Sequence, residues 1–221
     1  MLIAQISDCH IRDHGGELAR LVDTTETLRR VVDHLVGLDP APDVILATGD
    51  LTDDGTASQY AILLEVLAPI SDRLLPLPGN HDECPLFREA FADIIPGDVA
   101  DDHCSYVVED HPVRLVGLDN SIPGRHDGRF DALRERWLED VLAAGPDRPT
   151  LVFTHFPPFE TGLKFMDDAG LLDADRLRAV IPRSPQVRLL LTGHLHRPIP
   201  PALGPALAPT CPSTAHPTPF A

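Results

Sequence analysis

Five segments of this chain share one pattern, in which a hydrophobic run of strand length ends directly in side chains that carry oxygen or imidazole nitrogen. The segments end in Asp8-Cys9-His10, Gly49-Asp50, Gly79-Asn80-His81-Asp82, His155 and Gly193-His194-Leu195-His196. In an open α/β sheet, ligands bind outside the edge formed by the carboxyl ends of the strands. We therefore expect the five segments to meet at one site, although they span most of the 221 residues.

The side chains in these segments favour a site for two metal ions. Asp8 and His10 are two residues apart, so both project from the same side of an extended segment onto one ion. His194 and His196 repeat that spacing. Asp50 has two carboxylate oxygens and is expected to bridge two ions about 3.5–4 Å apart. Carboxylates with neutral imidazoles, and no required thiolate, suit iron, manganese, zinc or cobalt.

The rest of the pattern is that of an α/β protein, because β-branched hydrophobic runs alternate with helical periodicity. Strands are expected over 2–6, 44–48, 74–77, 106–108, 114–118, 151–154 and 187–192, and helices over 24–38, 58–67, 85–91, 131–143 and 175–181. The long connections 122–130 and 156–170 are expected to form walls of the site. Residues 1–197 are expected to form one domain. Residues 198–221, which are too rich in proline for a helix, are expected to form an extension or truncated tail that is extended or partly disordered.

Composition excludes several classes of function. The formal net charge is −16, with 34 acidic and 18 basic residues, so the chain lacks the basic stripe of a nucleic-acid binder. No run is long and apolar enough to span a membrane, and the N-terminus does not resemble a signal peptide, so the cytoplasm is the expected location. Cys9, Cys84, Cys104 and Cys211 form no Cys-x-x-Cys pair and are expected to be free thiols, with Cys9 in a packing role.

The series Asp-x-His, Gly-Asp, Gly-Asn-His-Asp, His and Gly-His-x-His resembles the calcineurin-like metallophosphoesterase superfamily, with all five blocks in order from Asp8 to His196. The segments His155-Phe156-Pro157-Pro158, Met166-Asp167 and the stretch from Gly193 to Pro198 are similar to class III cyclic-nucleotide phosphodiesterases and their glycerophosphodiesterase relatives. This resemblance implies a four-layer sandwich of two mixed β-sheets flanked by helices.

The resemblance also implies a role for each site residue. One metal ion is assigned to Asp8, His10, Asp50 and His196, and the second to Asp50, Asn80, His155 and His194. His81 falls at the family's histidine that contacts the phosphate, so it is the catalytic candidate, while Asp82 is expected to support a ligand histidine. In such a site, a hydroxide that bridges the two ions attacks phosphorus in line.

The predicted function is therefore hydrolysis of a small-molecule phosphodiester, with a 3',5'- or 2',3'-cyclic nucleotide as the first choice. A glycerophosphodiesterase or a broad phosphomonoesterase is the alternative. A non-catalytic scaffold is a remoter alternative, because such a protein should have lost ligands and this chain keeps all eight candidates. A nuclease is disfavoured by the acidic charge, and the chain is either a monomer or a homodimer.

Several further residues have more than one interpretation. The remaining histidines match no ligand spacing and are expected at the surface or at caps; they are His14, His34, His103, His111, His126 and His216. His216 is a weak exception because Pro-Ser-Thr-Ala-His resembles a segment of related phosphodiesterases. Asp53 either supports the site or forms a turn. Phe156 and Phe159 either line a wall for a nucleotide base or pack beneath the loop. The acidic cluster at residues 98, 101 and 102 is expected to be a solvated loop.

Overall fold

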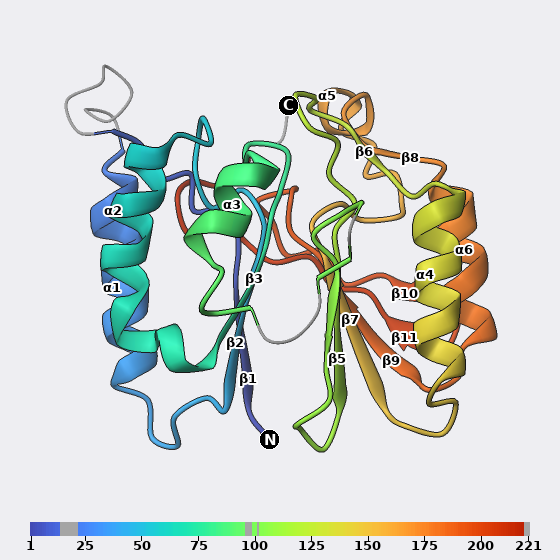
Figure 1. Cartoon of the computed structure of the whole chain (residues 1–221). Helices are drawn as coiled ribbons and strands as arrows, with labels where there is room; N and C mark the ends of the chain where they lie inside the picture. Colours follow the sequence, from blue (N-terminus) through green and yellow to red (C-terminus); the bar gives the residue numbers. More distant parts are fainter. Residues whose placement is uncertain (14–21, 96–98, 101, 219–221) are drawn as a thin grey trace.

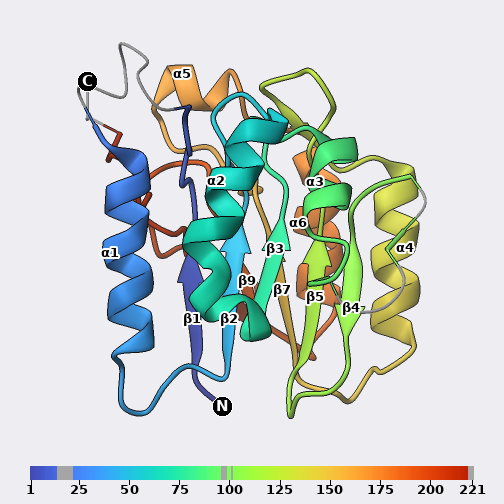
Figure 2. The ribbon, with the colours of Figure 1, turned by 60° about the vertical axis from the view of Figure 1, so that its left-hand side comes forward.

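The computed structural model describes residues 1–13, 22–95, 99–100 and 102–218, which form four layers (Figure 1). One outer layer contains α1 (Thr24–Val36), α2 (Ala57–Leu67) and α3 (Cys84–Ala90), and the other contains α4 (Ala132–Ala143) and α6 (Ala174–Arg183). Two β-sheets lie between these helical layers, and Figure 2 shows α3 between α2 and α4. The predicted sandwich of two sheets flanked by helices is confirmed.

The smaller sheet has the strand order β1-β2-β3 and the larger sheet the order β10-β11-β9-β7-β5-β4. The smaller sheet comprises β1 (Ile3–Ile6), β2 (Val44–Thr48) and β3 (Leu74–Leu77). The larger sheet comprises β4 (Tyr106–Val108), β5 (Arg114–Leu118), β7 (Thr150–Thr154), β9 (Val187–Leu191), β10 (Ala202–Leu203) and β11 (Ala206–Leu207). The larger sheet is mixed, as expected, whereas the described strands of the smaller sheet are all parallel. They are parallel because helical crossovers return the chain to the same end of the sheet.

Alternation along each central strand divides the hydrophobic side chains between the layers. In β2, Ile45 and Ala47 face the core beneath α1 and α2, while Val44 and Leu46 face the second sheet. In β7, Phe153 faces the first sheet and Val152 packs in the core with α4 and α6. Central strands buried on both faces must be hydrophobic throughout, which explains their nearly continuous apolar sequences.

The sequence predicted the long elements but not the short ones. Each predicted strand and helix exists with its ends displaced by at most two residues, and β4 and β5 pair as the expected antiparallel hairpin. The structure adds the 3-10 helix η2 (Ala68–Arg73), the strands β6 (Gly128–Arg129), β8 (Leu171–Leu172), β10 and β11, and the helix α5 (Lys164–Asp167). Most of these are too short to show a period in the sequence.

The two predicted wall segments are joined by a strand pairing of their own. β6 comes from the 122–130 connection and pairs in parallel with β8, which follows the 156–170 connection that contains α5. Residues 198–218 contain no helix, and β10 and β11 extend the larger sheet beyond β9. The predictions for residue 14, for residues 98 and 101 and for residues 219–221 concern positions outside the described residues.

None of the helices in the described part of the chain combines the length and the hydrophobicity needed to cross a membrane. The longest of them is α1, with 13 residues, and its sequence contains five charged residues or histidines.

Replacing Phe153 by Ala is expected to lower the free energy of unfolding by about 3–5 kcal/mol, because this ring is fully buried between the two sheets. Phe165→Ala is the matched control: that side chain is 53% exposed in α5, so its loss should change stability by less than about 0.5 kcal/mol. Urea denaturation of the two variants provides the comparison. Equal losses of stability would contradict the placement of Phe153 in the interface between the sheets.

Candidate metal centre

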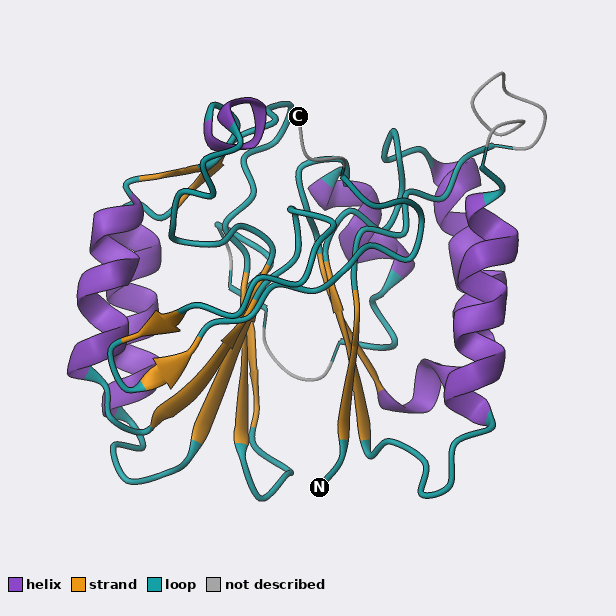
Figure 3. Cartoon of the chain, turned by 180° about the vertical axis from the view of Figure 1, so that it is seen from behind, coloured by secondary structure: helices purple, strands orange, loops and turns teal. Residues whose placement is uncertain are grey.

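The predicted site residues lie at the carboxyl ends of strands from both sheets. Asp8 and Asp50 follow β1 and β2, His155 follows β7, and His194 follows β9. Figure 3 shows the loops from the two sheets gathering above the line where the sheets meet. Asn80 reaches the same place from the loop after β3. The structure thus brings the five sequence segments together, as the pattern of strand ends predicted.

The backbone at this place is bent into an unusual conformation. Six described residues other than glycine have positive φ, and five of them are predicted ligands: Asp8 (53°), His10 (45°), Asp50 (49°), His194 (67°) and His196 (55°). A non-glycine residue in the left-handed region costs on the order of 1 kcal/mol or more and persists only where the surroundings fix it. Such outliers concentrate at functional sites, and here they turn successive side chains of one segment toward a common centre.

Two glycines allow the strand-end loops to approach each other. A Cβ on Gly79 would lie 2.2 Å from Oδ1 of Asp50, and a Cβ on Gly193 would lie 2.1 Å from Oγ of Ser7 and 2.9 Å from Oδ2 of Asp8. Any larger residue would push the carboxylates away. The glycines of the Gly-Asn-His-Asp and Gly-His-x-His segments are therefore required by packing against the acidic loops.

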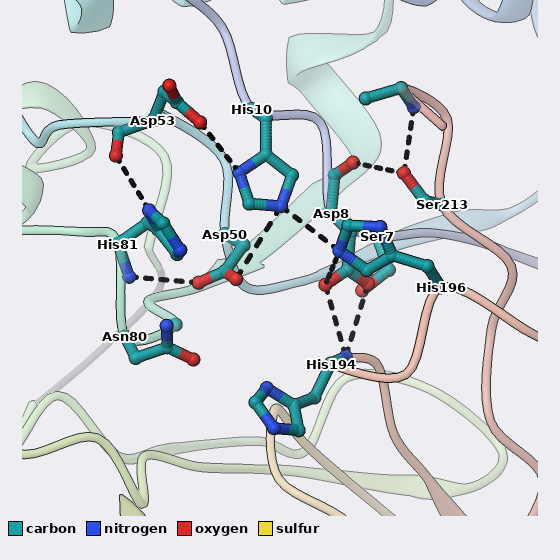
Figure 4. A network of polar contacts seen from close by, with 12 residues as sticks. Ser7, Asp8, His10, Asp50, Asp53, Asn80, His81, His194, His196 and Ser213 are labelled. Carbon is teal, nitrogen blue, oxygen red and sulfur yellow. Dashed lines mark hydrogen bonds and ion pairs between the residues drawn. The ribbon is translucent and has the colours of Figure 1, made fainter. Parts of the chain in front are cut away.

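The first predicted ligand set forms a compact group. Asp8, His10, Asp50 and His196 have ligand atoms that all lie within 4.8 Å of one another. Nε2 of His10 lies 3.1 Å from Nε2 of His196 and 3.7 Å from Oδ2 of Asp50 (Figure 4). Nε2 of His196 lies 3.3 Å from Oδ1 of Asp8.

The second predicted set adjoins the first through Asp50. Ligand atoms of Asp50, His155 and His194 lie within 4.8 Å of one another. Nε2 of His155 lies 3.4 Å from Oδ1 of Asp50 and 3.2 Å from Oδ1 of Asn80. Asp50 therefore turns Oδ2 toward the first set and Oδ1 toward the second, which is the geometry of a bridging carboxylate.

Hydrogen bonds to backbone carbonyls fix the tautomers of two of these histidines. Nδ1 of His155 lies 2.8 Å from the carbonyl oxygen of Thr48, and Nδ1 of His196 lies 2.8 Å from that of His216. A carbonyl oxygen only accepts, so each Nδ1 carries the hydrogen and donates it. When these rings are neutral, each Nε2 therefore has its lone pair directed at the centre, which is the form that binds a metal ion.

The donor atoms fit two cations. Nε2 of His194 is buried and has no hydrogen-bond partner among the described residues, and burial lowers the pKa of this histidine to about 3. A buried, neutral, unpartnered nitrogen is costly unless something binds its lone pair. The Nε2 atoms of His10 and His196 face each other at 3.1 Å, while the Nδ1 atom of each ring faces an oxygen acceptor. In the neutral rings the two Nε2 lone pairs therefore point at each other, and a cation between them relieves their repulsion. Oxygen and imidazole donors suit the borderline transition metals rather than a structural thiolate site.

Charges within the centre hold its carboxylates ionised. Burial alone raises the pKa of Asp50, but the nearby imidazoles of His155 and His10 hold it well below its ordinary value. For His155 the effects are reversed: burial lowers its pKa, but the Asp50 carboxylate raises it, to about 9. The carboxylates are therefore present in the charged form that a metal ion requires.

Asp53 supports the site, which decides between its two interpretations. Oδ1 of Asp53 lies 3.1 Å from Nδ1 of His10, and Oδ2 accepts a hydrogen bond of 2.8 Å from Nε of Arg12. Burial raises the pKa of this carboxyl, but the hydrogen bonds from His10 and Arg12 lower it by a larger amount. The pKa of Asp53 therefore lies below its ordinary value. Asp53 thus orients the His10 ring from behind.

The expectation that Asp82 supports a ligand histidine is wrong. Its carboxylate accepts hydrogen bonds from the backbone N–H groups of Leu51, Thr52 and Gly79 at 2.9–3.1 Å and from the hydroxyl of Tyr60 at 3.0 Å. These donors belong to the loops after β2 and β3 and to α2. Asp82 therefore fastens together the loops that present Asp50 and Asn80, because its side chain turns inward to satisfy buried backbone donors.

His81 lies beside the two sets without belonging to either. Its backbone N–H donates to Oδ1 of Asp50 at 3.0 Å, and its Nδ1 lies 2.7 Å from the carbonyl oxygen of Asp53. The ligand atoms of His10, Asp53 and His81 also fall within 4.8 Å of one another, but Nδ1 of His81 is engaged by that carbonyl. The ring is half-buried and packs edge-on against His10, with ring centroids 4.8 Å apart.

The sequence reasoning largely missed a contribution from the C-terminal segment. Oγ of Ser213 donates to the carbonyl oxygen of Asp8 at 2.7 Å, and the N–H of Thr214 donates to the carbonyl of Ser7 at 3.1 Å. The carbonyl of His216 fixes His196, as described above, and the two rings lie 4.8 Å apart. The Pro-Ser-Thr-Ala-His resemblance was the one signal for this support.

The other open residues take mixed roles. Cys9 is fully buried in the hydrophobic core, which confirms its packing role. Phe156 is also fully buried, with its ring 4.5 Å from that of His194, so it packs beneath the loop and lines no wall. Phe159 lines a cavity of about 390 Å³ next to His194. His126 was expected at the surface or at a cap, and its exposed ring lies 5.7 Å from that of His81. The same expectation is wrong for His103, which is 4% exposed and packs edge-on against Trp137.

A family model described as calcineurin-like phosphoesterase matches residues 1–198 of the chain. The chain belongs to this family. A glycerophosphodiester phosphodiesterase, GpdQ, of Enterobacter lignolyticus is 32% identical over 221 residues, which is all of this chain and 80% of the relative. The cyclic adenosine monophosphate phosphodiesterase CpdA of Pseudomonas aeruginosa is 32% identical over 214 residues, or 97% of this chain and 76% of the relative.

A dimetal phosphatase from Danio rerio has a similar structure, with a TM-score of 0.72 at 17% identity over 96% of this chain and 87% of the phosphatase. This likeness concerns the fold. The predicted superfamily is thus confirmed, and this phosphoesterase is a hydrolase of phosphoric esters that carries a grouped set of metal-ligand candidates.

Two metal ions per chain are expected, and Asn80→Ala should reduce the number to one. The amide oxygen of Asn80 faces only the second set, so its loss removes a ligand from that set alone. His34→Ala, a change at an exposed histidine of α1, is the control and should retain two ions. Elemental analysis of the metal-saturated proteins provides the measurement. An Asn80→Ala protein that still holds two ions would contradict the assignment.

Proposed function

We propose that this phosphoesterase hydrolyses small phosphodiesters at a centre of two metal ions, with a cyclic nucleotide as the first choice of substrate and a glycerophosphodiester as the second. The observation that carries the proposal is the orientation of Asp50, whose two carboxylate oxygens face different groups of ligand atoms. The names of the similar proteins GpdQ and CpdA, which refer to these two substrate classes, support the choice.

The proposed ligands are those of the two sets. Asp8, His10, Asp50 and His196 hold one ion, and Asp50, Asn80, His155 and His194 hold the other. Iron, manganese, zinc and cobalt all suit these donors. When bound, two such ions polarise the phosphoryl oxygens and supply hydroxide from water near neutral pH. Asn80 is half-buried whereas the other ligands are buried, so the substrate approaches from the Asn80 side.

His81 is the proposed catalytic residue. Because its Nδ1–H donates to the carbonyl of Asp53, the ring is held in one orientation and Nε2 is left for the substrate. When the ring is protonated, Nε2–H donates to a phosphoryl oxygen or transfers its proton to the leaving oxygen. The short link from the His81 backbone to Asp50 keeps this ring in fixed relation to the bridging carboxylate.

The cavity beside His194 is the proposed space for the rest of the substrate. It has a volume of about 390 Å³ and its wall includes Phe159, Met166 and Leu171. Its edge also carries the exposed carboxylates of Glu160, Asp168, Asp173 and Asp175, against a single guanidinium, that of Arg178. Apolar surface suits a base or a glycerol carbon chain, while the acidic edge repels further phosphate groups. The cavity therefore favours a small diester with a single negative charge over a polyphosphate or a nucleic acid.

The proposal extends to the setting in which the protein acts. We place the protein in the cytoplasm, acting on a small-molecule substrate, either as a monomer or as a homodimer. We assign residues 1–197 to the catalytic domain and treat residues 198–221 as an extension. The Ser213 and His216 contacts indicate that part of this extension supports the ligands Asp8 and His196.

Substrate preference tests the proposed function. Metal-loaded protein should hydrolyse 3',5'- and 2',3'-cyclic nucleotides, glycerophosphodiesters and bis(p-nitrophenyl) phosphate with a higher kcat/KM than the monoester p-nitrophenyl phosphate. The reason is that the acidic cavity edge disfavours the second negative charge of a monoester. If the monoester is cleaved far faster and every cyclic nucleotide is inert, the protein is a phosphatase and the proposal is wrong.

His81→Ala should lower kcat by about 10²–10⁴-fold while leaving both metal ions bound, because an acid–base or phosphate-contacting residue acts mainly in the transition state. Asn80→Ala is the matched contrast, since it should lose metal. Initial rates and metal content measured on the same preparations separate the two effects. An empty site in the His81→Ala protein would show that His81 is a ligand.

A further inference from the structure

A second group of reactive side chains lies apart from the metal centre. Cys84 at the start of α3, Cys104 before β4 and Asp119 after β5 have ligand atoms that all lie within 4.8 Å of one another. They line a cavity of about 290 Å³ together with Arg88 and Arg134. The mechanism proposed above uses none of these residues.

The two thiols are positioned to react with each other. Cys84 is half-exposed at the cavity, whereas Cys104 is buried. A disulfide bond measures about 2.05 Å, so sulfur atoms no more than 4.8 Å apart can bond after modest side-chain rotation. Cys104 is held from the other side, because its backbone N–H donates to Oδ2 of Asp119 at 2.8 Å.

The surroundings favour thiol chemistry over a bound cation. The Asp119 carboxylate already accepts hydrogen bonds from the N–H of Cys104 and from the N–H and hydroxyl of Ser121, at 2.6–2.8 Å. Arg88 and Arg134 add positive charge to the same cavity. A metal ion would have to displace those hydrogen bonds and approach two guanidinium groups, whereas a Cys84 thiolate gains from the positive charge of Arg88.

The two thiols differ in acidity in the way that such chemistry requires. A hydrogen bond from Cys104 lowers the pKa of the Cys84 thiol, although burial and the charge of Asp119 act in the opposite direction. The same hydrogen bond and burial raise the pKa of Cys104 far above its ordinary value. Since Cys84 is also the thiol that the cavity exposes, it is the nucleophile, and the buried Cys104 is the thiol that resolves its oxidised form.

The other two cysteines provide an internal comparison. Cys9 and Cys211 are buried, and burial raises the pKa of Cys9 to about 12 and also raises that of Cys211. A buried thiol that remains protonated reacts slowly with oxidants. Cys104 is buried as well, but it lies within 4.8 Å of the cavity-lining Cys84 and needs to react only with the oxidised form of that residue, whereas neither Cys9 nor Cys211 lines this cavity.

We propose that Cys84 and Cys104 are a reversible, peroxide-sensitive dithiol that forms a disulfide. The Cys84 thiolate attacks a hydroperoxide oxygen, the O–O bond breaks, and Cys84 sulfenic acid forms as hydroxide or alkoxide leaves. The sulfur of Cys104 then attacks the sulfur of Cys84, the S–O bond breaks, and water leaves with the Cys104 proton. The two thiols lose two electrons and the peroxide gains them. Excess thiol, such as glutathione, reverses the reaction by exchange.

The disulfide would act close to the metal centre. Cys84 lies four residues after Asn80, and α3 directly continues the turn that presents Asn80 and His81. The bond would tie the start of α3 to the segment that enters β4 in the other sheet. Closing the 84–104 loop restricts the unfolded chain, so the oxidised protein should melt at a higher temperature, by on the order of 5 °C.

The test is a thiol count on the zinc-loaded, full-length protein before and after treatment with one equivalent of hydrogen peroxide. Zinc is used because it has no redox chemistry of its own. Alkylation under denaturing conditions should find four thiols before treatment and two after, and dithiothreitol should restore four. Peptide mass spectrometry should find Cys84 linked to Cys104 with the loss of two hydrogens.

Variants show which sulfur acts first. Cys84→Ser should retain its three thiols after peroxide treatment, whereas Cys104→Ser should accumulate a sulfenic acid on Cys84 that dimedone traps. Cys211→Ser is the matched control and should still lose two thiols. Four unchanged thiols in the natural protein, a Cys9–Cys211 link, or a zinc ion that is lost on Cys84→Ser would each overturn the proposal. The mass spectrum of the natural protein decides the outcome even if the buried Cys104→Ser variant fails to fold.

Discussion

Two carboxylates buried next to each other, Asp8 and Asp50, are the constraint on which this structure depends. They are at most 2% exposed, and the charge of each raises the free energy of the other. Burying like charges is tolerable only if surrounding groups compensate them. The imidazoles of His155 and His196 compensate these two negative charges. The left-handed backbone and the close glycine contacts keep the carboxylates and the imidazoles together. The strained geometry is therefore what makes this accumulation of charge possible.

The sequence predicted those parts of the fold whose signal is periodic and those parts of the site that lie at strand ends. Asp82 shows where prediction from local sequence fails. Its position next to His81 suggested a role beside a histidine, but its carboxylate turns inward to the N–H groups of Leu51 and Gly79. The pairing of β6 with β8 could not be read from two-residue strands. The support from Ser213 depends on the path of the C-terminal segment, which no local pattern encodes.

The architecture separates the residues that perform chemistry from those that surround the substrate. The ligand candidates follow strands of two packed sheets, whereas the cavity wall comes from α5, β8 and the connections beside them. Rigid strands fix positions to within fractions of an ångström, while loops tolerate substitution. Such a division explains how similar proteins with the same fold are named for different substrates, as GpdQ and CpdA are.

The contacts between Asp8 and the last part of the chain have a consequence for how the protein is made. His196 is synthesised about 190 residues after Asp8, which at ~5–20 residues per second takes roughly 10–40 s. During that interval the nascent chain displays the Asp8 carboxylate without the imidazole and the Ser213 hydroxyl that later cover this loop. The first ligand set therefore stays incomplete until His196 has been synthesised, so a metal ion held by this complete set cannot guide the folding of the residues made before it.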